Sequence, residues 1–589
     1  MMDPIFGDTM MPAQRLEKHL QLHAGVKHAR RVVPRAPRPG ESIQLTLVTS
    51  GALPFERAVC LYQTAAQKTE TLELARTRVT WDAGVGDYLT YWTGTLPPQA
   101  NETMVRYRIA AHVAGTGEEI FADNASTRMA DATEFAMYVT DRVAPAWARD
   151  ALVYHIFVDR FYPGDGVAWK QPDSLGGFFG GTLRGIIQKL DYVAELGFNA
   201  IWLSPLFVSP SHHGYDAADY YTVEPRLGTN ADLVELFERA HARGMRVLLD
   251  FVANHWSHLH ATFQDAQTDP HSPYRDWYTW REYPHSYETY FDVPTLPQVN
   301  VRHPDARNYL LDSAAYWLKQ GADGFRLDYA TGPSDDFWAD FYRACKTTKA
   351  DAWLFGEIIA SPSAQARYEG IMDGVLDFHL GRALRQTFGS GEWTLAQFEA
   401  FLAAHEKFFP PALMRPVFLD NHDQDRFLFL AGDNAEKLEL AALVLFALAQ
   451  PGIVYNGTEV GVTQTQLIHS NNRAVFEEAR RPMKWGAEQN ADLYDAFRKL
   501  IRLRKQYPAL AYGTRRLLHL NSAGGTYAFA REWNDSTVVV AVNTSDSDKT
   551  ISVPRWTTTA RDVLNAQRVN ASAGQLEIVL HAHSGALLV

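Results

Sequence analysis

The alternation of hydrophobic and polar positions divides the chain into three regions. Residues 1–141 contain short alternating runs separated by turn residues, such as "SIQLTLVTS", "YLTYWTGTLPP" and "MVRYRIAAHVAG". A period of two is typical of half-buried strands, so this region is predicted to form an antiparallel β-sandwich of the carbohydrate-binding type. In residues 509–589 the runs "GTYAFAREW" and "STVVVAVNTS" indicate a second antiparallel β-domain.

Between residues 142 and 508 the pattern changes at "ALVYHIFVDRF", and short apolar runs alternate with segments of helical period. Further predicted strands are Asn199–Ser204, Arg246–Phe251, Gly324–Asp328, Trp353–Glu357, Val417–Asn421 and Gly452–Tyr455. Repeated strand–helix units favour the α/β class and a parallel (β/α)8 TIM barrel. Residues 256–305 are too long for a simple loop, and we expect them to form an inserted subdomain after the third strand.

Composition limits the partners and the location of the protein. The formal charge of −12 argues against nucleic acid or an anionic membrane as the main partner. The two cysteines, Cys60 and Cys345, exclude a disulfide framework and favour a reducing, cytoplasmic location. The N-terminal residues have no secretory pattern, and the most apolar run, Leu438–Gly452, is too short to span a bilayer. That run is predicted to be a buried helix.

Polar side chains gather where the predicted strands end. In a β/α barrel the chemistry lies at the C-terminal ends of the strands. The residues at these ends and in the loop "SPSHHGYDAADYYTV" are Tyr215, Asp216, Asp250, Asn254, His255, Arg326, Asp328, Glu357, Asn421, His422 and Asp423. Because such ends meet at one mouth, their convergence predicts an active site there.

The strand "GFRLD" carries Arg326 and Asp328 two positions apart, so both side chains point to one side. One interpretation is a structural ion pair. The other is a nucleophilic carboxylate that Arg326 keeps ionised in a poorly solvated site. Two carboxyl groups about 5–5.5 Å apart are typical of retaining glycosidases, in which one attacks and the other is a general acid. Under that interpretation the acid keeps its proton through desolvation or a negative neighbour.

The ordered motifs "GFNAIWLSPLF", "DFVANH", "GFRLD", "GE", "DNHD" and "PGIVYNGTEVG" resemble those of the α-amylase family of glycoside hydrolases. The resemblance implies that Asp328 is the nucleophile and Glu357 the general acid/base. It implies that Asp423 is a third catalytic carboxylate, which stabilises the oxocarbenium-like transition state. The implied substrate-binding residues are Tyr215, His255, Arg326 and His422, together with Asp216 and Arg426, which are expected to pair with each other.

The N-terminal sandwich and "YHIFVDRFYPGD" look most like the neopullulanase, cyclomaltodextrinase and maltogenic amylase branch. This implies hydrolysis of α-1,4-glucosidic bonds in maltodextrins, cyclodextrins or pullulan, with transfer of sugars as a side reaction. It also implies a homodimer through the N-terminal domain. Two alternatives remain open: an α-glucosidase or glucosyltransferase that forms trehalose or isomaltulose, and a non-catalytic binding module, which the three retained carboxylates disfavour.

The chain departs from this branch at three places. It has "LPQVN" at 296–300 instead of "MPKLN", and Tyr329–Pro333 instead of an Ala-Asn-Glu type segment after the nucleophile. Pro163 and Thr182 replace two oxygen donors of the family's calcium site near the first strand. Because calcium needs six to eight oxygen ligands, we predict that this site is lost and that the enzyme has no cofactor and no metal.

Overall fold

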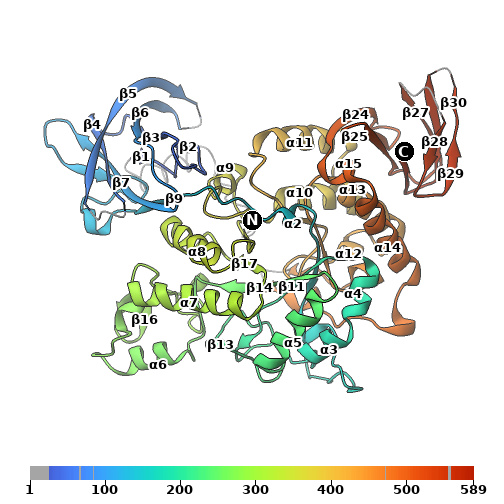
Figure 1. Cartoon of the computed structure of the whole chain (residues 1–589), viewed down its shortest axis with the longest axis horizontal. Helices are drawn as coiled ribbons and strands as arrows, with labels where there is room; N and C mark the ends of the chain where they lie inside the picture. The colour runs from blue at the N-terminus through green and yellow to red at the C-terminus, as the bar shows by residue number, and fades with distance from the viewer. Residues whose placement is uncertain (1–24, 65–67, 84, 471–472, 555–558, 573) are drawn as a thin grey trace.

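A computed structural model of the chain describes residues 25–64, 68–83, 85–470, 473–554, 559–572 and 574–589. Antiparallel strands occupy the N-terminal region, the barrel lies at the centre and a second group of strands ends the chain (Figure 1). The N-terminal strands are β1 (Val26–Lys27), β2 (Val32–Val33), β3 (Ile43–Thr49), β4 (Phe55–Gln63), β5 (Glu70–Asp82), β6 (Asp87–Leu96), β7 (Thr103–Val113), β8 (Glu119–Phe121) and β9 (Phe135–Val139). They enclose a hydrophobic core of their own.

Eight parallel strands form the central sheet. They are β10 (Leu152–Ile156), β11 (Ala200–Leu203), β14 (Arg246–Val252), β17 (Gly324–Asp328), β18 (Trp353–Gly356), β19 (Gly374–Val375), β20 (Val417–Phe418) and β21 (Gly452–Tyr455). The order is β19-β18-β17-β14-β11-β10-β21-β20, and hydrogen bonds from Val375 N to Met414 O and from Asp377 N to Pro416 O, both 2.9 Å, close the ring. The predicted (β/α)8 barrel is confirmed. The short strand β19 is the one that the sequence pattern did not reveal.

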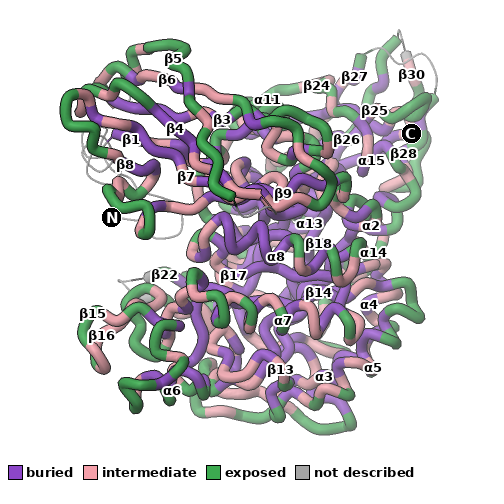
Figure 2. Tube along the Cα trace, turned by 60° about the vertical axis from the view of Figure 1, so that its left-hand side comes forward, coloured by how far each residue is buried: buried purple, intermediate pink, exposed green. Residues whose placement is uncertain are grey.

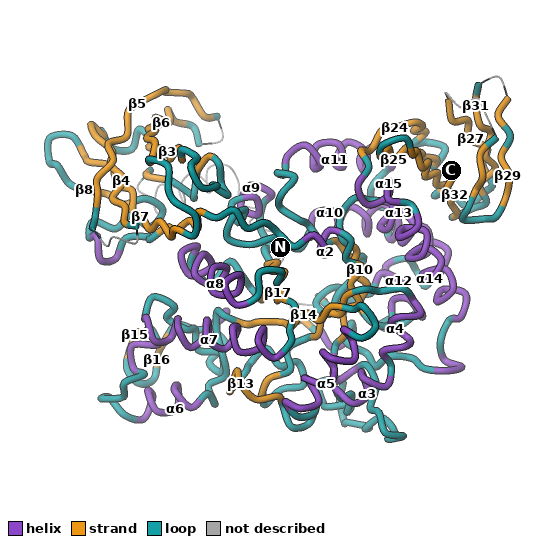
Figure 3. The backbone as a smooth tube through the Cα atoms, viewed as in Figure 1, coloured by secondary structure: helices purple, strands orange, loops and turns teal. Residues whose placement is uncertain are grey.

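Helices surround the strands as an outer layer (Figure 3). They are α3 (Leu183–Gln188), α4 (Leu190–Leu196), α5 (Asn230–His241), α7 (Pro304–Gln320), α8 (Asp335–Thr348), α9 (Pro362–Ala366), α10 (Phe378–Leu384), α11 (Leu395–Phe408), α12 (Phe427–Leu430), α13 (Ala435–Ala447) and α14 (Ala491–Gln506). The start of α5 is set by a capping box between Thr229 and Asp232. Helix α13 is buried as predicted, and among the described residues no helix has the length and apolar character needed to span a bilayer.

The barrel strands are buried on both faces, whereas the surrounding helices expose their outer sides (Figure 2). Every residue of β17 is buried, including its arginine and its aspartate. A buried charge is tolerated only when it is paired, so this strand requires partners from its neighbours. The segment after β14 holds α6 (Ala261–Thr268), β15 (Trp280–Glu282), β16 (Ser286–Tyr287) and the short helix η4 (Tyr290–Asp292).

A C-terminal group of strands completes the chain. After α15 (Pro508–Tyr512) the C-terminal strands are β24 (Thr514–Asn521), β25 (Thr526–Trp533), β26 (Ser536–Asn543), β27 (Lys549–Pro554), β28 (Ala560–Asp562), β29 (Gln567–Val569), β30 (Ala571–Ser572), β31 (Gln575–Leu580) and β32 (Ser584–Leu588). They form a six-stranded and a three-stranded antiparallel sheet.

At the N-terminal end of the chain, Arg106 of β7 contacts Asp340 of α8 at 2.5 Å, which attaches the N-terminal sheet to the barrel. The boundaries at 141 and 508 stay predictions.

Candidate active site

The two carboxylates expected to carry the chemistry lie at the C-terminal ends of neighbouring strands. Asp328 is the last residue of β17, and Glu357 follows the last residue of β18. The strands are paired in parallel, with Leu327 opposite Gly356, and Glu357 N donates to Leu327 O at 2.9 Å. The register therefore places the two side chains side by side at the mouth of the barrel.

Arg326 connects these two carboxylates. Its Nη1 donates a hydrogen bond to Asp328 Oδ1 at 2.8 Å, and its Nη2 lies 2.8 Å from Glu357 Oε1. All three side chains are at least nine-tenths buried. One guanidinium thus bridges the pair, an arrangement that requires both carboxylates to face the same cleft.

A further carboxylate, Asp250 of β14, lies behind the pair. Both its oxygens accept hydrogen bonds from Arg326 Nη1, at 2.8 and 3.0 Å. Asp250 Oδ2 also accepts from the Tyr215 hydroxyl at 3.1 Å and from Trp202 Nε1 at 3.2 Å. One buried arginine therefore serves three carboxylates, and the site carries an excess of negative charge.

This imbalance decides the protonation of the pair. Burial, opposed by Arg326, raises the pKa of Asp328 to about 7, with Asp250 and Asp423 adding repulsion. Burial likewise raises the pKa of Glu357 to about 7. The expectation that Arg326 keeps Asp328 ionised is therefore wrong, because desolvation and neighbouring anions outweigh one shared cation. Near neutral pH the two carboxyl groups hold about one proton between them.

Asp423 has a different environment from the pair. Its Oδ2 lies 2.9 Å from His422 Nε2, and its Oδ1 accepts a hydrogen bond from Arg480 Nη2 at 2.6 Å. Burial would raise the pKa of Asp423, but these partners outweigh it and hold the pKa well below its usual value. Because burial lowers the pKa of His422 as well, Arg480 supplies the permanent positive charge. Asp423 is therefore ionised.

Aromatic side chains line the same mouth. The Tyr215 hydroxyl is 2.5 Å from His422 Nε2, and the two rings are stacked at 5.4 Å. His255 stacks on Tyr290 of η4 with ring centroids 4.3 Å apart. The inserted segment thereby supplies one side of the site. Burial lowers the pKa of His255 to about 4, so its ring is neutral and can donate and accept hydrogen bonds.

The expected pair between Asp216 and Arg426 does not form. Asp216 Oδ1 accepts hydrogen bonds from the hydroxyls of Ser209 and Ser211, the former at 2.6 Å. Arg426 is fully buried and donates to the carbonyls of Ala479 and Asn456 at 2.8 and 3.0 Å. Hydroxyl groups therefore bind Asp216, and main-chain oxygens accept from Nε and Nη1 of Arg426, so each side chain has partners other than the one expected. The remaining predicted residues converge at the mouth.

Sequence reasoning missed two residues that belong to this cluster: Tyr290 and Arg480. Asp250 is among the predicted strand-end residues, and the register of β14 and β17 places it opposite Arg326. Tyr290 lies in the inserted segment, where no periodic pattern points inward. Arg480 lies in "RRPMKW", where no pattern points to the site, and only the fold brings it to Asp423.

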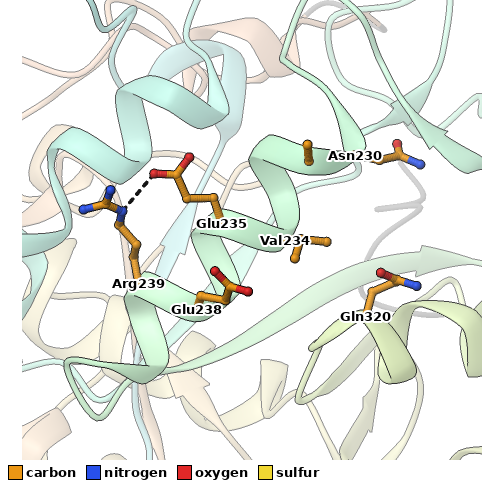
Figure 4. A pocket seen from close by; sticks show the side chains of 7 residues that line it. Asn230, Val234, Glu235, Glu238, Arg239 and Gln320 are labelled. Atoms are coloured by element: carbon orange, nitrogen blue, oxygen red, sulfur yellow. Dashed lines mark hydrogen bonds and ion pairs between the residues drawn. The ribbon is translucent and has the colours of Figure 1, made fainter.

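A separate concavity of about 790 Å³ lies on the helical outer layer (Figure 4). Its lining residues are Asn230, Ala231, Val234, Glu235, Glu238, Arg239 and Gln320. They come from α5 and the end of α7, and Glu235 is already paired with Arg239 at 2.8 Å. None of the carboxylates at the mouth borders it, so we do not place the chemistry there. Among the described residues, no group of three or more His, Cys, Asp and Glu side chains is arranged to hold a metal ion.

Comparisons with known proteins agree with this geometry. A family model described as the catalytic domain of alpha-amylase matches residues 155–511. Alpha-amylase 2 of Dictyoglomus thermophilum is 32% identical over 93% of this chain and 93% of its own length. Neopullulanase 2 of Thermoactinomyces vulgaris is 33% identical over 75% of this chain and 78% of its own length. A solved cyclomaltodextrinase structure superposes with a TM-score of 0.71 and 25% identity, covering 96% of this chain and all of the other. The chain therefore belongs to the alpha-amylase family of glycosidases.

Proposed function

We propose that this enzyme hydrolyses α-1,4-glucosidic bonds with retention of configuration. Asp328 attacks the anomeric carbon while Glu357 gives its proton to the departing glycosidic oxygen, which forms a glycosyl-enzyme ester. In the second step Glu357 accepts a proton from water, the water oxygen attacks the same carbon, and the Asp328 carboxylate leaves. An alcohol of a second sugar in place of water gives transfer.

The observation that carries this proposal is the guanidinium of Arg326 between Asp328 and Glu357. Both carboxylates lie 2.8 Å from this guanidinium, so the pair shares one cation and faces one cleft. Because both pKa values are raised to about 7, one member can be ionised while the other keeps its proton, as a nucleophile and a general acid require. The positions of the family motifs "GFRLD" and "GE" support Asp328 as the nucleophile and Glu357 as the acid.

The transition state carries positive charge on the sugar ring, and Asp423 suits its stabilisation. A carboxylate held ionised by His422 and Arg480 does not need to lose a proton during the reaction. Its charge is fixed before the oxocarbenium character develops, which is the arrangement that lowers such barriers most.

The substrates that we propose are maltodextrins, cyclodextrins and pullulan. The names of two relatives, a neopullulanase and a cyclomaltodextrinase, support this choice over a trehalose- or isomaltulose-forming transferase. The aromatic rings of Tyr215 and Tyr290 at the mouth suit neutral sugar rings, which present apolar C–H faces.

The test is a product profile on maltotriose, β-cyclodextrin and pullulan, with the anomer of the first product read by proton NMR. We expect maltose and glucose released first as α-anomers, and no product from Asp328→Asn. β-Anomers would overturn the retaining mechanism. Trehalose or an α-1,6-linked disaccharide as the main product would favour the transferase instead.

We further propose that catalysis needs no calcium and no other cofactor. At the place of the family's calcium site, Thr182 Oγ1 donates to Pro163 O at 2.8 Å and accepts from Gly185 N at 2.9 Å. The Asp159 carboxylate accepts from Phe179 N and Gly180 N at 3.0 and 2.9 Å. These oxygens already have protein donors, so they do not fit a cation that requires six or more free ligands.

A homodimer through the N-terminal region and a cytoplasmic location are also proposed. Three exposed apolar side chains, Val79, Trp81 and Tyr88, lie on β5 and β6, and Trp81 and Tyr88 are 57% and 60% exposed. Burial of such rings against a second copy would remove apolar surface from water. Cys60 and Cys345 are both buried free thiols, which suits a reducing compartment. Sedimentation velocity on the intact protein and on Trp81→Ser tests the dimer: a monomeric wild type would contradict it.

A further inference from the structure

The residue that follows the nucleophile has an unusual backbone. Tyr329 has φ +38°, a left-handed conformation that bulky L-residues rarely adopt. Its carbonyl accepts a hydrogen bond from Gly332 N at 2.9 Å, and the next residue, Ala330, donates from N to Glu357 O at 3.1 Å. A non-glycine residue in this region is disfavoured unless the surrounding structure holds it there, and such residues gather at functional sites.

Aromatic contacts hold Tyr329 in this conformation. Its ring meets the ring of Tyr290 edge-on at 4.9 Å and that of Phe291 at 5.4 Å. Phe291 is itself 64% exposed and has φ +46°, so two left-handed residues from distant segments contact each other at the rim. Gly332 leaves room for the ring, since a Cβ there would lie 2.9 Å from Cδ1 of Tyr329. The inserted segment thereby fixes the loop that follows the nucleophile.

The left-handed turn aims one donor at the second carboxylate. Tyr329 N donates a hydrogen bond to Glu357 Oε2 at 3.0 Å. An N–H group can only donate, so this hydrogen bond is strongest when Oε2 carries negative charge. The other oxygen, Oε1, lies 2.8 Å from Arg326 Nη2, so two separate donors hold the two oxygens of the Glu357 carboxyl group.

We propose that Tyr329 is a positioning residue for Glu357: its strained backbone, braced by the rings of Tyr290 and Phe291, presents the N–H that orients the acid. This rests on the proposed function, in which Glu357 is the acid/base. The ring of Tyr329 acts through the main chain, and the aromatic side chain serves to keep φ positive.

The same hydrogen bond influences proton transfer. The N–H stabilises the carboxylate form and opposes the rise that burial causes in the pKa of Glu357. The charged or titratable groups that face Glu357 are Arg326, Asp328, Asp250, Asp423 and Tyr290. All five residues are retained in each Tyr329 variant. Loss of the N–H donor therefore raises the pKa of Glu357, and the alkaline limb of the pH profile, which reports deprotonation of the acid, moves to higher pH.

Three substitutions distinguish the effect of the backbone conformation of Tyr329 from the effect of its ring. Tyr329→Phe keeps both and should behave as the wild type. Tyr329→Gly loses the ring but adopts a positive φ without strain, so the N–H stays on Glu357 and the alkaline limb of kcat/KM should not move. Tyr329→Ala loses the ring and still disfavours positive φ. Its alkaline limb should rise by about one pH unit, and its kcat should fall about tenfold.

The measurement is kcat and kcat/KM from pH 4.5 to 9 on the substrate that the wild type cleaves fastest, with thermal midpoints recorded for each variant. An unchanged alkaline limb in Tyr329→Ala would overturn the proposal, as would an equal shift in the glycine variant. A rise in KM alone, equal in the alanine and glycine variants, would mean that the ring of Tyr329 contacts sugar. If instead the wild type were inactive, or Glu357→Gln as active as the wild type, the proposed function itself would fail.

Discussion

Arg480 Nη2 donates a hydrogen bond to Asp423 Oδ1 at 2.6 Å, although 57 residues separate the two in the sequence. The same guanidinium donates from Nε to the carbonyl of His422 at 2.9 Å. Arg480 therefore fixes both the charge of the third carboxylate and the main chain that carries it. Arg326 binds the other three carboxylates, so each cation serves a different part of the site.

Arg480→Met should impair activity most at low pH. Without the guanidinium the depressed pKa of Asp423 returns upward, so the carboxylate is lost by protonation as the pH falls. We expect kcat/KM to fall by roughly 10²-fold at neutral pH, with the acidic limb displaced to higher pH. The matched control is Arg481→Met, which removes a neighbouring arginine paired with Glu478 at 2.8 Å. Equal losses in both variants, with unmoved limbs, would refute the role of Arg480.

The two members of the catalytic pair are expected to respond differently to the leaving group. Asp328→Asn should lose at least about 10⁴-fold in kcat on any glycoside, because no covalent intermediate forms. Glu357→Gln should lose a similar factor on maltodextrins but recover its first step on 4-nitrophenyl α-maltoside, since nitrophenolate leaves without protonation.

A burst of nitrophenol from Glu357→Gln, measured by stopped flow, checks this assignment. Asp423→Asn is the control that keeps both members of the pair. The roles would have to be exchanged if Asp328→Asn, and not Glu357→Gln, produced the burst.

Replacement of Arg326 should show a pH-dependent loss of stability. The three carboxyl groups around it have pKa values of about 6 to 7 through burial, so the folded protein binds protons that the unfolded chain has released. Their pKa values are raised by folding, and stability is therefore lost as the pH rises through them. In Arg326→Leu these pKa values rise further, because the cation that favours the ionised forms is gone.

We expect the thermal midpoint of Arg326→Leu to lie close to the wild type at pH 5, where the carboxyls are protonated. At pH 8 the variant should be less stable by about 3–5 kcal/mol, the usual effect of leaving buried charges unpaired. Turnover should be lost at both pH values. A constant gap between the two melting curves from pH 5 to 8 would show that the carboxyls do not titrate in this range.

Removal of divalent cations should leave the enzyme active and equally stable. In the loop after β10, Thr182, Phe179 and Gly180 donate hydrogen bonds to the oxygens of Pro163 and Asp159, which on our proposal leaves no cation site there. After dialysis against EDTA, we expect kcat to change by less than about twofold and the thermal midpoint by less than about 2 °C, the scale of a surface perturbation. Metal analysis of the dialysed sample accompanies the assay. A melting temperature restored by added calcium would contradict the prediction.

The sequence by itself determined the barrel and the identity of its three carboxylates. Alternation and helical periodicity locate strands and helices because each element buries one face, and the C-terminal ends of parallel strands necessarily meet. Arg326 and Asp328 could be placed on one side from their spacing alone. The two-residue strand β19 escaped, since two residues carry no period.

Only the tertiary structure decided how charge is shared. One arginine serves Asp250, Asp328 and Glu357, and it does not offset the burial and the neighbouring carboxylates that raise the pKa of Asp328, where the local pair suggested the opposite. The partners of Asp216 and Arg426, the arrival of Arg480 and the strained turn at Tyr329 likewise depend on segments that are distant along the chain. Coulomb forces and desolvation act through space and depend on every group nearby. A periodic sequence pattern reports only which face of one segment is buried.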